Sequence, residues 1–421
     1  MIAVIGLGFI GLTTALGFSH YGYKVFGVDS DRSRLELLKN NQIPFHEPSL
    51  KKVLETQQNK NFYICDSILE CINRCEIIFF CVGTPCLKNG LVDLDPLKIA
   101  MGEVINSIQS GAKKLLVIRS TIPPTTTTEF LHPYMKSQGA HLKENIKLAV
   151  NPEFLREGLA WEDFTHPDRI VVGEMDTESG SRLEKLYKPF KAPVFRVSCN
   201  TAEFIKYLSN TLLATLISFS NEQKMLAENI GNVDIPRSFD ILHKDRRWSG
   251  SPASMVNYVF PGCGFGGYCL PKDAEALCKL GQSKGFPLPM LEKTLEINRK
   301  IKQFVVGQVV ERVDTQESLG ILGLAFKPHT DDVRETPARD IIQGLLDSGF
   351  SKLIVYDPMA NDSFRTAYGL PVKYAGSVTE LSEQVSQILI LTAWPEFLDY
   401  ADKIKDKQLF DFRYLFSEAT N

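Results

Sequence analysis

The chain has 421 residues, which is enough for two or three domains with large hydrophobic cores. Hydrophobic residues make up 44% and charged residues 23%, the proportions of an ordinary globular protein. A formal net charge of −3 excludes an overall basic character of the kind that binds nucleic acid or acidic lipid, and no nucleic-acid-binding module signature is present.

The first residues, MIAVIGLGFIGLTTALGF, are nearly all apolar and raise the question of a signal peptide or a membrane helix. They lack a basic n-region and an A-x-A-like cleavage site. We interpret residues 1–29 as a strand, a glycine turn, a helix from about Gly11 to Tyr21 and a second strand. Because no other apolar run is long enough to cross a bilayer, we expect a cytoplasmic protein without a membrane segment.

A G-x-G-x-x-G pattern, GLGFIG, stands between the first strand and its helix. Gly6 permits a tight turn, Gly8 lets a pyrophosphate approach the backbone, and Gly11 allows close helix packing. Asp29 ends the next strand, where a carboxylate accepts from adenosine ribose hydroxyls and repels a 2′-phosphate. The pattern predicts NAD in preference to NADP, although Arg34 places a cation nearby. Glycines that serve packing alone are the alternative, and the strand–turn–helix context disfavours it.

Further apolar strands are expected at 76–83, 114–120, 146–151 and 169–173, with helical stretches between most of them. Alternation of helices with fully apolar strands predicts a doubly wound parallel sheet that is buried on both faces.

Three of these strands end in motifs rich in proline and polar residues: VGTP (82–85), STIPP (120–124) and VNPEFLREG (150–158). Ligands bind at the carboxyl ends of the strands in open α/β sheets. Each motif alone reads as a plain loop, but together they predict one ligand-binding rim.

The nine cysteines are scattered and odd in number, which disfavours a disulfide framework in a cytoplasmic protein. A zinc site is the alternative, because Cys71/Cys75 and Cys81/Cys86 are close pairs. Neither pair has C-x-x-C spacing, so we expect buried free thiols and no metal.

Residues 201–231 lack proline and internal glycine, and their apolar positions recur at steps of three and four residues, which predicts one long helix. Lys206 and Asn210 share a face of it and direct a cation and an amide to one place. A solvated polar stripe is the alternative. Asn221 and Glu222 continue the polar line along an otherwise apolar helix, which favours a functional face.

The loop PGCGFGGYCLPKD (261–273) surrounds Cys269 with glycines and is followed by Lys272 and Asp273. Beside a lysine and backbone amides, a thiol can have a lowered pKa and act as a nucleophile at neutral pH. A single cysteine is more often a small buried hydrophobe. This glycine- and proline-rich setting is not that of a core residue.

The α/β pattern returns after residue 318, with strands expected at 318–326, 352–358, 386–394 and 408–412 and a helix from about Pro337 to Asp347. We predict an α/β protein with two Rossmann-like doubly wound lobes, joined by the long central helix and a helical middle domain. The expected domains are 1–198 (NAD-binding), 199–300 (central helical, either a rigid connector or a dimerisation surface, with the cysteine loop) and 301–421 (the second α/β lobe). The active site is expected in the cleft between the lobes.

Taken together, these motifs resemble the UDP-glucose/GDP-mannose dehydrogenase family over nearly the whole chain. GFGGYCLPKD looks like the family's nucleophile loop, and VGTP, STIPP, NPEFLREG and GLAFKPHTDDVRETP (323–337) are similar to its other blocks, in family order. The resemblance implies two successive NAD-dependent oxidations at C6 of a nucleotide sugar, from alcohol to carboxylate. UDP-glucose, giving UDP-glucuronate for surface polysaccharide, is the expected substrate.

The resemblance implies that 199–300 is the dimerisation domain and 301–421 the nucleotide-sugar-binding domain, and it also implies roles for individual residues. Cys269 would form a thiohemiacetal and then a thioester, Lys206 and Asn210 would stabilise the oxyanion, and Asp273, with Glu153 through water, would act as base while Thr121 orients that water. The implied NAD contacts are Gly6, Gly8, Phe9, Ile10, Gly11, Asp29, Arg34, Thr84, Thr121, Glu157, Lys272 and Arg334. The implied substrate contacts are Glu153, Phe154, Leu155, Arg156, Glu157, Lys206, Asn210, Arg246, Tyr258, Val259, Phe260, Pro261, Gly262, Gly266 and Lys327.

Arg246 resembles an arginine that reaches the partner subunit's substrate site, which implies a homodimer built on the long helix. Long spacing before the cysteine loop leaves Arg246 and Arg247 as alternatives. FDFRYLF (410–416) differs from the F-D-G-R type ending of many members, so a substrate contact by Arg413 stays open.

Three alternatives remain at this point. The same chemistry could act on GDP-mannose or a UDP-N-acetylhexosamine. A two-electron β-hydroxyacid dehydrogenase also combines a Rossmann lobe with a helical lobe, but it would need neither the cysteine loop nor a second α/β lobe. A degenerate NAD-binding regulator is disfavoured because every chemical position of the family is filled.

Overall fold

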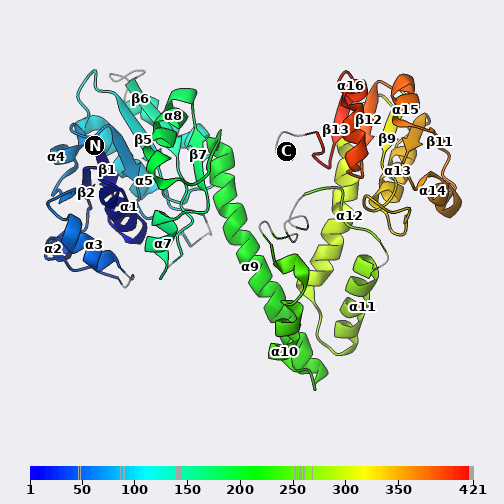
Figure 1. The fold of residues 1–421 in the computed structure, drawn as a ribbon, viewed down its shortest axis with the longest axis horizontal. Coiled ribbons are helices and arrows are strands. Elements are labelled where there is room, and N and C mark those ends of the chain that lie inside the picture. The colour runs from blue at the N-terminus through cyan, green and yellow to red at the C-terminus, as the bar shows by residue number, and fades with distance from the viewer. Residues whose placement is uncertain are drawn as a thin grey trace. The chain divides into compact units, whose positions relative to one another are not determined.

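The computed structural model describes residues 1–421 except 46, 48, 86, 89–90, 139–144, 157, 251–252, 254, 256–257, 259–260, 268 and 417–421; the side chains of 217, 221, 228, 269, 272, 273, 276 and 277 are also outside the description. The chain forms two compact units, Met1–Thr215 and Leu216–Asn421. The boundary lies within α9 (Cys199–Ile230), the long green helix of Figure 1. The expected division into three domains stays a prediction.

The first unit contains an eight-stranded sheet in the order β3-β2-β1-β4-β5-β6-β7-β8, whose first six positions have the order of a dinucleotide-binding Rossmann sheet. Strands β1, β2 and β5 are buried along their whole length, and β4 is buried at three of its four residues, as expected for strands covered on both faces. The strands are β1 (Ile2–Ile5), β2 (Val25–Val28), β3 (Phe62–Ile64), β4 (Ile77–Phe80), β5 (Lys114–Ile118), β6 (Ile146–Val150), β7 (Ile170–Glu174) and β8 (Val194–Ser198).

Helices cover both faces of this sheet (Figure 1). One apolar core includes residues of α1, α2, α3, α7 and α8, and the other includes residues of α4, α5, α6 and the start of α9. The helices are α1 (Phe9–His20), α2 (Arg32–Lys39), α3 (Leu50–Gln57), α4 (Ile68–Ile72), α5 (Asp95–Ser107), α6 (His132–Gln138), α7 (Ala160–Thr165) and α8 (Thr177–Tyr187).

One strand pairing departs from the expected all-parallel sheet: β6 and β7 are antiparallel. The segment between them, residues 151–169, therefore starts and ends at the same edge of the sheet, because an antiparallel connection does not return to the opposite edge. That edge is formed by the carboxyl ends of β1, β4, β5 and β6, so the whole segment stays where ligands bind in this fold.

The second unit contains a five-stranded parallel sheet in the order β11-β10-β9-β12-β13, around a single apolar core. Its order repeats the first five positions of the other sheet, which confirms two Rossmann-like lobes. The strands are β9 (Leu319–Leu322), β10 (Leu353–Tyr356), β11 (Lys373–Tyr374), β12 (Gln387–Ile390) and β13 (Gln408–Asp411). The helices are α10 (Ile235–Leu242), α11 (Cys269–Ser283), α12 (Pro289–Val310), α13 (Pro337–Asp347), α14 (Asn361–Tyr368), α15 (Val378–Gln384) and α16 (Ala401–Ile404).

The second lobe has an acidic residue, Asp357, after β10, at the position that corresponds to Asp29 after β2. Its carboxylate accepts backbone N–H groups of Leu324, Ala325 and Ala360 and the indole N–H of Trp394, and the residue is 2% exposed. All of its acceptor capacity serves the protein itself, so Asp357 is not available to bind a ribose.

Glu222 also has a structural contact. Its Oε1 accepts the backbone N–H of Met290 at 2.9 Å and so ties α9 to the start of α12. Its part in the predicted functional face is therefore not supported; Asn221 has its side chain outside the described part.

Seven cysteines with described side chains are free and buried. In the part of the chain that the structure describes, no cluster of three or more His, Cys, Asp or Glu side chains could hold a metal ion. Among the described helices, none is both long and apolar enough to cross a membrane.

Candidate active site

The glycine turn of the first unit has the geometry that its sequence predicts. Gly6 has a φ of +89°, and a Cβ there would lie 2.8 Å from the carbonyl oxygen of Cys81. A Cβ on Gly11 would lie 1.7 Å from the carbonyl oxygen of Gly6. A Cβ on Gly8 would meet nothing within 4 Å. Two glycines are thus required by packing, while the third keeps open space in front of the amino end of α1.

This turn forms one wall of a cavity of about 820 Å³. Phe9 and Ile10 form the first turn of α1, whose free N–H groups and dipole favour an anion. The cavity's other walls come from β2, the start of α4, the end of β4 and α5. Its lining includes Gly6, Gly8, Asp29, Arg34, Asp66, Ile68, Val82, Gly83, Ile99 and Glu103. A dinucleotide's pyrophosphate and adenosine fit these walls: the open space at Gly8, the anion-favouring helix end and the apolar side chains from α4 and α5.

Asp29 is held in place at the end of β2. Its Oδ2 accepts the backbone N–H of Leu7 at 2.6 Å and a guanidinium N–H of Arg34 at 2.7 Å, and its Oδ1 accepts the N–H of Asp31 at 2.8 Å. Three acceptor positions are taken, and a carboxylate offers about four. One remains for a ribose hydroxyl. Arg34 is engaged by the same carboxylate, so a 2′-phosphate would have to compete for it.

The ends of β4 and β5 meet at the expected rim. The hydroxyl of Thr84 donates to the carbonyl oxygen of Thr121 at 2.8 Å, and the Ser120 hydroxyl donates to the carbonyl oxygen of Val82 at 2.6 Å. The two motifs VGTP and STIPP are therefore tied to each other, as their positions at neighbouring strand ends predict.

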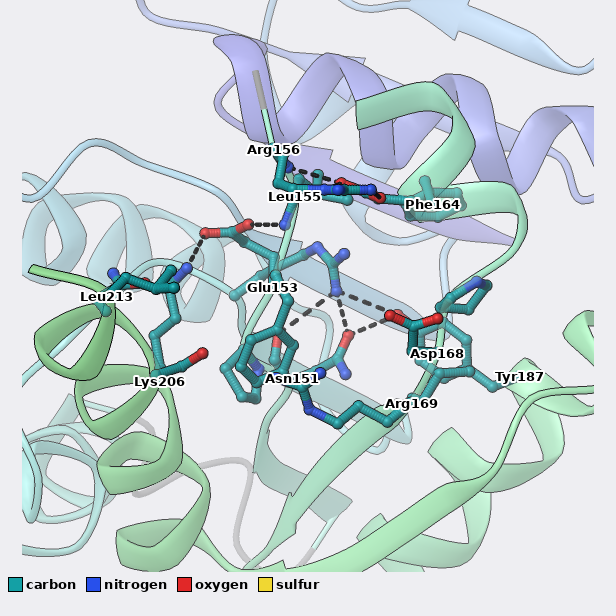
Figure 2. Close-up of a pocket in the computed structure, with 18 residues that line it drawn as sticks. Asn151, Glu153, Leu155, Arg156, Phe164, Asp168, Arg169, Tyr187, Lys206 and Leu213 are labelled. Atoms are coloured by element: carbon teal, nitrogen blue, oxygen red, sulfur yellow. Dashed lines mark hydrogen bonds and ion pairs between the residues drawn. The ribbon is translucent and has the colours of Figure 1, made fainter. Parts of the chain in front are cut away.

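A second cavity in the same unit, of about 370 Å³, lies at the carboxyl end of β6. Lys206 from α9 forms an ion pair with Glu153 at 2.9 Å, and both side chains are almost completely buried (Figure 2). The second Glu153 oxygen accepts the N–H of Leu155 at 2.7 Å. Phe154 places its ring 5.6 Å from the Lys206 ammonium. Asn210, one helical turn beyond Lys206, is exposed and also lines this cavity.

Arg156 extends away from this ion pair. Its guanidinium binds both carboxylate oxygens of Asp163, at 3.0 and 2.6 Å, and the pair holds the pKa of Asp163 below its ordinary value (Figure 2). The predicted substrate contact Glu157 lies outside the described residues.

The sequence did not predict a buried polar cluster that lines this cavity, the polar floor formed by Asn151, Arg119 and Tyr187. The Asn151 side-chain oxygen accepts from both Arg119 and the Tyr187 hydroxyl, and its amide donates to the Val171 carbonyl at 2.8 Å. Burial raises the pKa of Tyr187 to about 12, so this hydroxyl remains a donor at neutral pH. Arg119 is 5% exposed and has no carboxylate partner among the described residues. The only indication in the sequence was a single polar residue, Asn151, directly after an apolar strand.

In the second unit, the cysteine loop contacts α12 on one side and the segment before α13 on the other. The N–H of Phe265 donates to Asn298 at 2.8 Å, and the N–H of Gly267 donates to the Arg334 carbonyl at 2.9 Å. A Cβ on Gly266 would lie 2.3 Å from the carbonyl oxygen of Glu335. The glycines thus allow close backbone packing, which fixes the loop where α11 begins.

Of the two cysteines in the loop, Cys263 is buried, and burial raises its pKa to about 12. It is therefore a protonated core thiol at neutral pH. Cys269 is the first residue of α11, the helix end that stabilises a thiolate. Its side chain, with those of Lys272 and Asp273 one turn later, lies outside the described part.

The structure distinguishes the two candidate arginines. Arg247 binds Asp245, with Nε 2.9 Å from Oδ2, and its guanidinium lies 5.5 Å from the centre of the Tyr258 ring. Arg246 is exposed, and its side chain has no ion pair or hydrogen bond to a described residue. Arg246 is thus the one of the two that is free to reach another molecule.

The other residues of this unit that were predicted to contact substrate or NAD are partly placed. Arg413, left open by the sequence, packs on Gly262, where a Cβ would lie 2.3 Å from its Nη1, and its Nε is buried without a hydrogen-bond partner. Lys327 places its ammonium 5.5 Å from the Phe326 ring, and Arg334 binds Asp332 at 2.7 Å. Pro261 is exposed, and Val259 and Phe260 lie outside the described residues.

Similarity to known proteins extends over nearly the whole chain. Three profiles of the UDP-glucose/GDP-mannose dehydrogenase family match: its NAD binding domain at residues 1–191, its central domain at 200–300 and its UDP binding domain at 320–418. The chain is 34% identical to the UDP-glucose 6-dehydrogenase TuaD of Bacillus subtilis, over 99% of this chain and 89% of that protein. It is 31% identical to the GDP-mannose 6-dehydrogenase of Pseudomonas aeruginosa, over 96% and 93%.

The fold is similar to that of a solved ternary complex of GDP-mannose dehydrogenase from Pseudomonas aeruginosa, with a TM-score of 0.86, 28% identity and coverage of 98% and 96%. A UDP-glucose dehydrogenase from Pyrobaculum islandicum is 35% identical with a TM-score of 0.56, over 98% of this chain and 94% of that one.

Proposed function

Because the chain belongs to the UDP-glucose/GDP-mannose dehydrogenase family, an NAD-dependent family, we propose that it oxidises UDP-glucose to UDP-glucuronate. The observation that carries this proposal is the buried Lys206–Glu153 pair, set at the same sheet edge as the Thr84–Thr121 contact and the glycine turn. UDP-glucose is favoured over GDP-mannose because seven of eight similar relatives, TuaD among them, are UDP-glucose 6-dehydrogenases. GDP-mannose is the second candidate, on the strength of the fold match.

The reaction needs a residue that retains the substrate between two oxidations. The residues around the glycine turn would hold NAD, which would supply the hydride acceptor for both oxidations. The Cys269 thiol adds to the C6 aldehyde, forming an S–C bond, and the carbonyl oxygen receives a proton to give a thiohemiacetal. Loss of the second hydride and a proton gives a thioester. Water cleaves the S–C bond, so that the carboxylate leaves and the thiol is restored.

Lys206 and Asn210 are the donors for the oxygen on C6. In the tetrahedral states this oxygen carries developing negative charge, and one preorganised donor is typically worth about 3 kcal/mol of barrier. Lys206 is fixed by Glu153 at 2.9 Å, so the protein orients it before substrate binds. Glu153 is acceptor-only when ionised and can receive a proton from the attacking water, which Thr121 orients, with Asp273 as the second base.

We also propose a cytoplasmic homodimer. Helix α9 exposes a series of large apolar side chains that a second copy would cover: Phe204, Leu208, Leu213, Leu216 and Phe219. Arg246, free in the single chain, would then serve the partner's substrate site. A reducing cytoplasm suits a catalytic thiol and free buried cysteines.

A substrate comparison tests the proposal. Purified protein is incubated with NAD and UDP-glucose, GDP-mannose or UDP-N-acetylglucosamine, with NADH followed by absorbance and product identified by mass spectrometry. We expect UDP-glucose to have the highest kcat/KM and to give the acid without free aldehyde. A higher kcat/KM for GDP-mannose would transfer the proposal to that sugar, and aldehyde as the end product would overturn the thioester route.

A further inference from the structure

Glu203 is a buried carboxylate that none of the roles above uses. It lies on α9 three residues before Lys206 and is 2% exposed. Its Oε1 accepts the backbone N–H of Thr127 at 2.9 Å. Its Oε2 is buried and has no partner of hydrogen-bonding geometry among the described residues. A carboxylate is costly to bury with so few partners, so its presence calls for a function.

The contact of Glu203 with Thr127 holds a strained turn in place. Thr125, a β-branched residue, has a φ of +74°, in the left-handed region that such residues rarely adopt. A π-helix, Thr126–Leu131, follows directly. The N–H groups of Thr125 and Thr126 and the Thr127 hydroxyl also surround the carboxylate; burial still raises the pKa of Glu203 overall. A turn of this kind persists only where its surroundings hold it.

The turn is the continuation of the STIPP motif. Only Ile122, Pro123 and Pro124 separate Thr121 from Thr125, and proline fixes φ. The Thr126 hydroxyl donates to the Pro123 carbonyl at 2.6 Å, and Ile122 is buried. The connection is therefore stiff, and a displacement of the turn would move Thr121.

At its other end, Glu203 belongs to the helix that carries Lys206. A second contact joins the same two elements, since the Thr128 hydroxyl donates to the Asn200 side chain at 2.9 Å. Thr121 and Lys206 come from different elements, and the reaction requires both to face the same C6 carbon.

We propose that Glu203 is a positioning residue for the oxidation: it anchors the strained turn to α9 and so sets Thr121 relative to Lys206. The effect on catalysis rests on the proposed function. The anchoring of the turn to α9 does not depend on it, because it is a property of the fold.

Three variants test it. Glu203→Met keeps the length of the side chain and removes the acceptor, while Glu203→Gln keeps an acceptor for the Thr127 N–H. Lys114→Met is the matched control: it is buried at the opposite end of β5, where its ammonium binds the carbonyl oxygens of Ile72 and Asn73 at 3.0 and 3.1 Å. It removes comparable buried contacts from the same unit, away from the site.

We expect Glu203→Met to lower kcat with UDP-glucose at least about tenfold, and Glu203→Gln and Lys114→Met to stay within about threefold of the unmodified protein. Melting temperatures of Glu203→Met and Lys114→Met should fall by similar amounts. Amide hydrogen exchange over residues 121–128 should accelerate in Glu203→Met and not in Lys114→Met.

Glu203→Met with a kcat equal to that of Lys114→Met, or unchanged exchange over 121–128, would overturn the inference. So would a Glu203→Gln variant as slow as Glu203→Met. If the unmodified protein made no NADH from UDP-glucose, the proposed function would fail, and the exchange measurement would still decide the anchoring. Should Glu203→Met not fold, Asn200→Ala removes the second link and predicts the same exchange pattern with a smaller fall in kcat.

Discussion

Gly8→Ala isolates the cofactor role of the glycine turn from its packing role. Gly8 has φ −67° and ψ −166°, which alanine adopts without strain, and its added Cβ would meet no protein atom within 4 Å. The folded protein should therefore be as stable as before, or more stable by up to about 1 kcal/mol, because alanine reduces the entropy of the unfolded chain. The new methyl group would occupy the space in front of the first turn of α1.

The expected effect on NADH binding follows from that position. Displacing the pyrophosphate removes at least one charge-assisted hydrogen bond from a backbone N–H, worth about 1.5–3 kcal/mol. The Kd for NADH should rise about 10- to 150-fold. Gly11→Ala is the contrasting variant: its Cβ would lie 1.7 Å from the Gly6 oxygen, so binding and stability should both fall, stability by about 1–3 kcal/mol.

NADH fluorescence titration and thermal unfolding measure the two quantities. Gly307→Ala is the matched control, because a Cβ there also meets nothing within 4 Å and the residue lies on α12 of the second unit. A Gly8→Ala variant that binds NADH as tightly as the control would refute the assignment of this turn to the pyrophosphate. A Gly8→Ala variant as unstable as Gly11→Ala would refute the packing argument.

Three further outcomes are expected. Lys206→Met removes a donor to the oxygen on C6 and should lower kcat about 100- to 1000-fold. It also leaves the Glu153 carboxylate buried without a cation, which should lower the free energy of unfolding by about 3–5 kcal/mol. A near-normal kcat in steady-state assays would contradict the first expectation. Arg246→Ala should raise KM for UDP-glucose about tenfold or more without dissociating the dimer in sedimentation, and a larger rise in Arg247→Ala would reverse the assignment. Asp29→Ser releases Arg34 for a 2′-phosphate and should raise the NADP to NAD ratio of kcat/KM at least about tenfold; an unchanged ratio would exclude Asp29 as the selector.

The sequence predicted the interior of both sheets, because buried parallel strands are continuous apolar runs. β1, β4, β5 and β10 lie within their predicted ranges, and α13 has its predicted bounds. Strands β3, β8 and β11 were not predicted. All three lie at sheet edges, are short or half-exposed, and lack the apolar run that marks an interior strand.

The glycines and strand-end motifs could be identified because each depends on residues that are neighbours in the sequence, such as those of a turn, a helix end or a proline-containing loop. The polar floor around Asn151 could not, since its partners Arg119 and Tyr187 are separated from it by 32 and 36 positions. Glu203 likewise pairs with Thr127 across 76 positions. The preference for Arg246 over Arg247 stays a prediction, and it rests on the contact between Arg247 and Asp245, which spacing alone does not reveal.

Cys269 is proposed to hold the sugar covalently between two oxidations. The most direct measurement is the number of NADH formed per UDP-glucose consumed, in the unmodified protein and in Cys269→Ala. We predict two NADH per sugar, with only trace turnover in the variant, because without the thiol the second hydride has no covalent intermediate to leave from. One NADH per sugar in the unmodified protein, or a Cys269→Ala variant as fast as it, would contradict the thioester route.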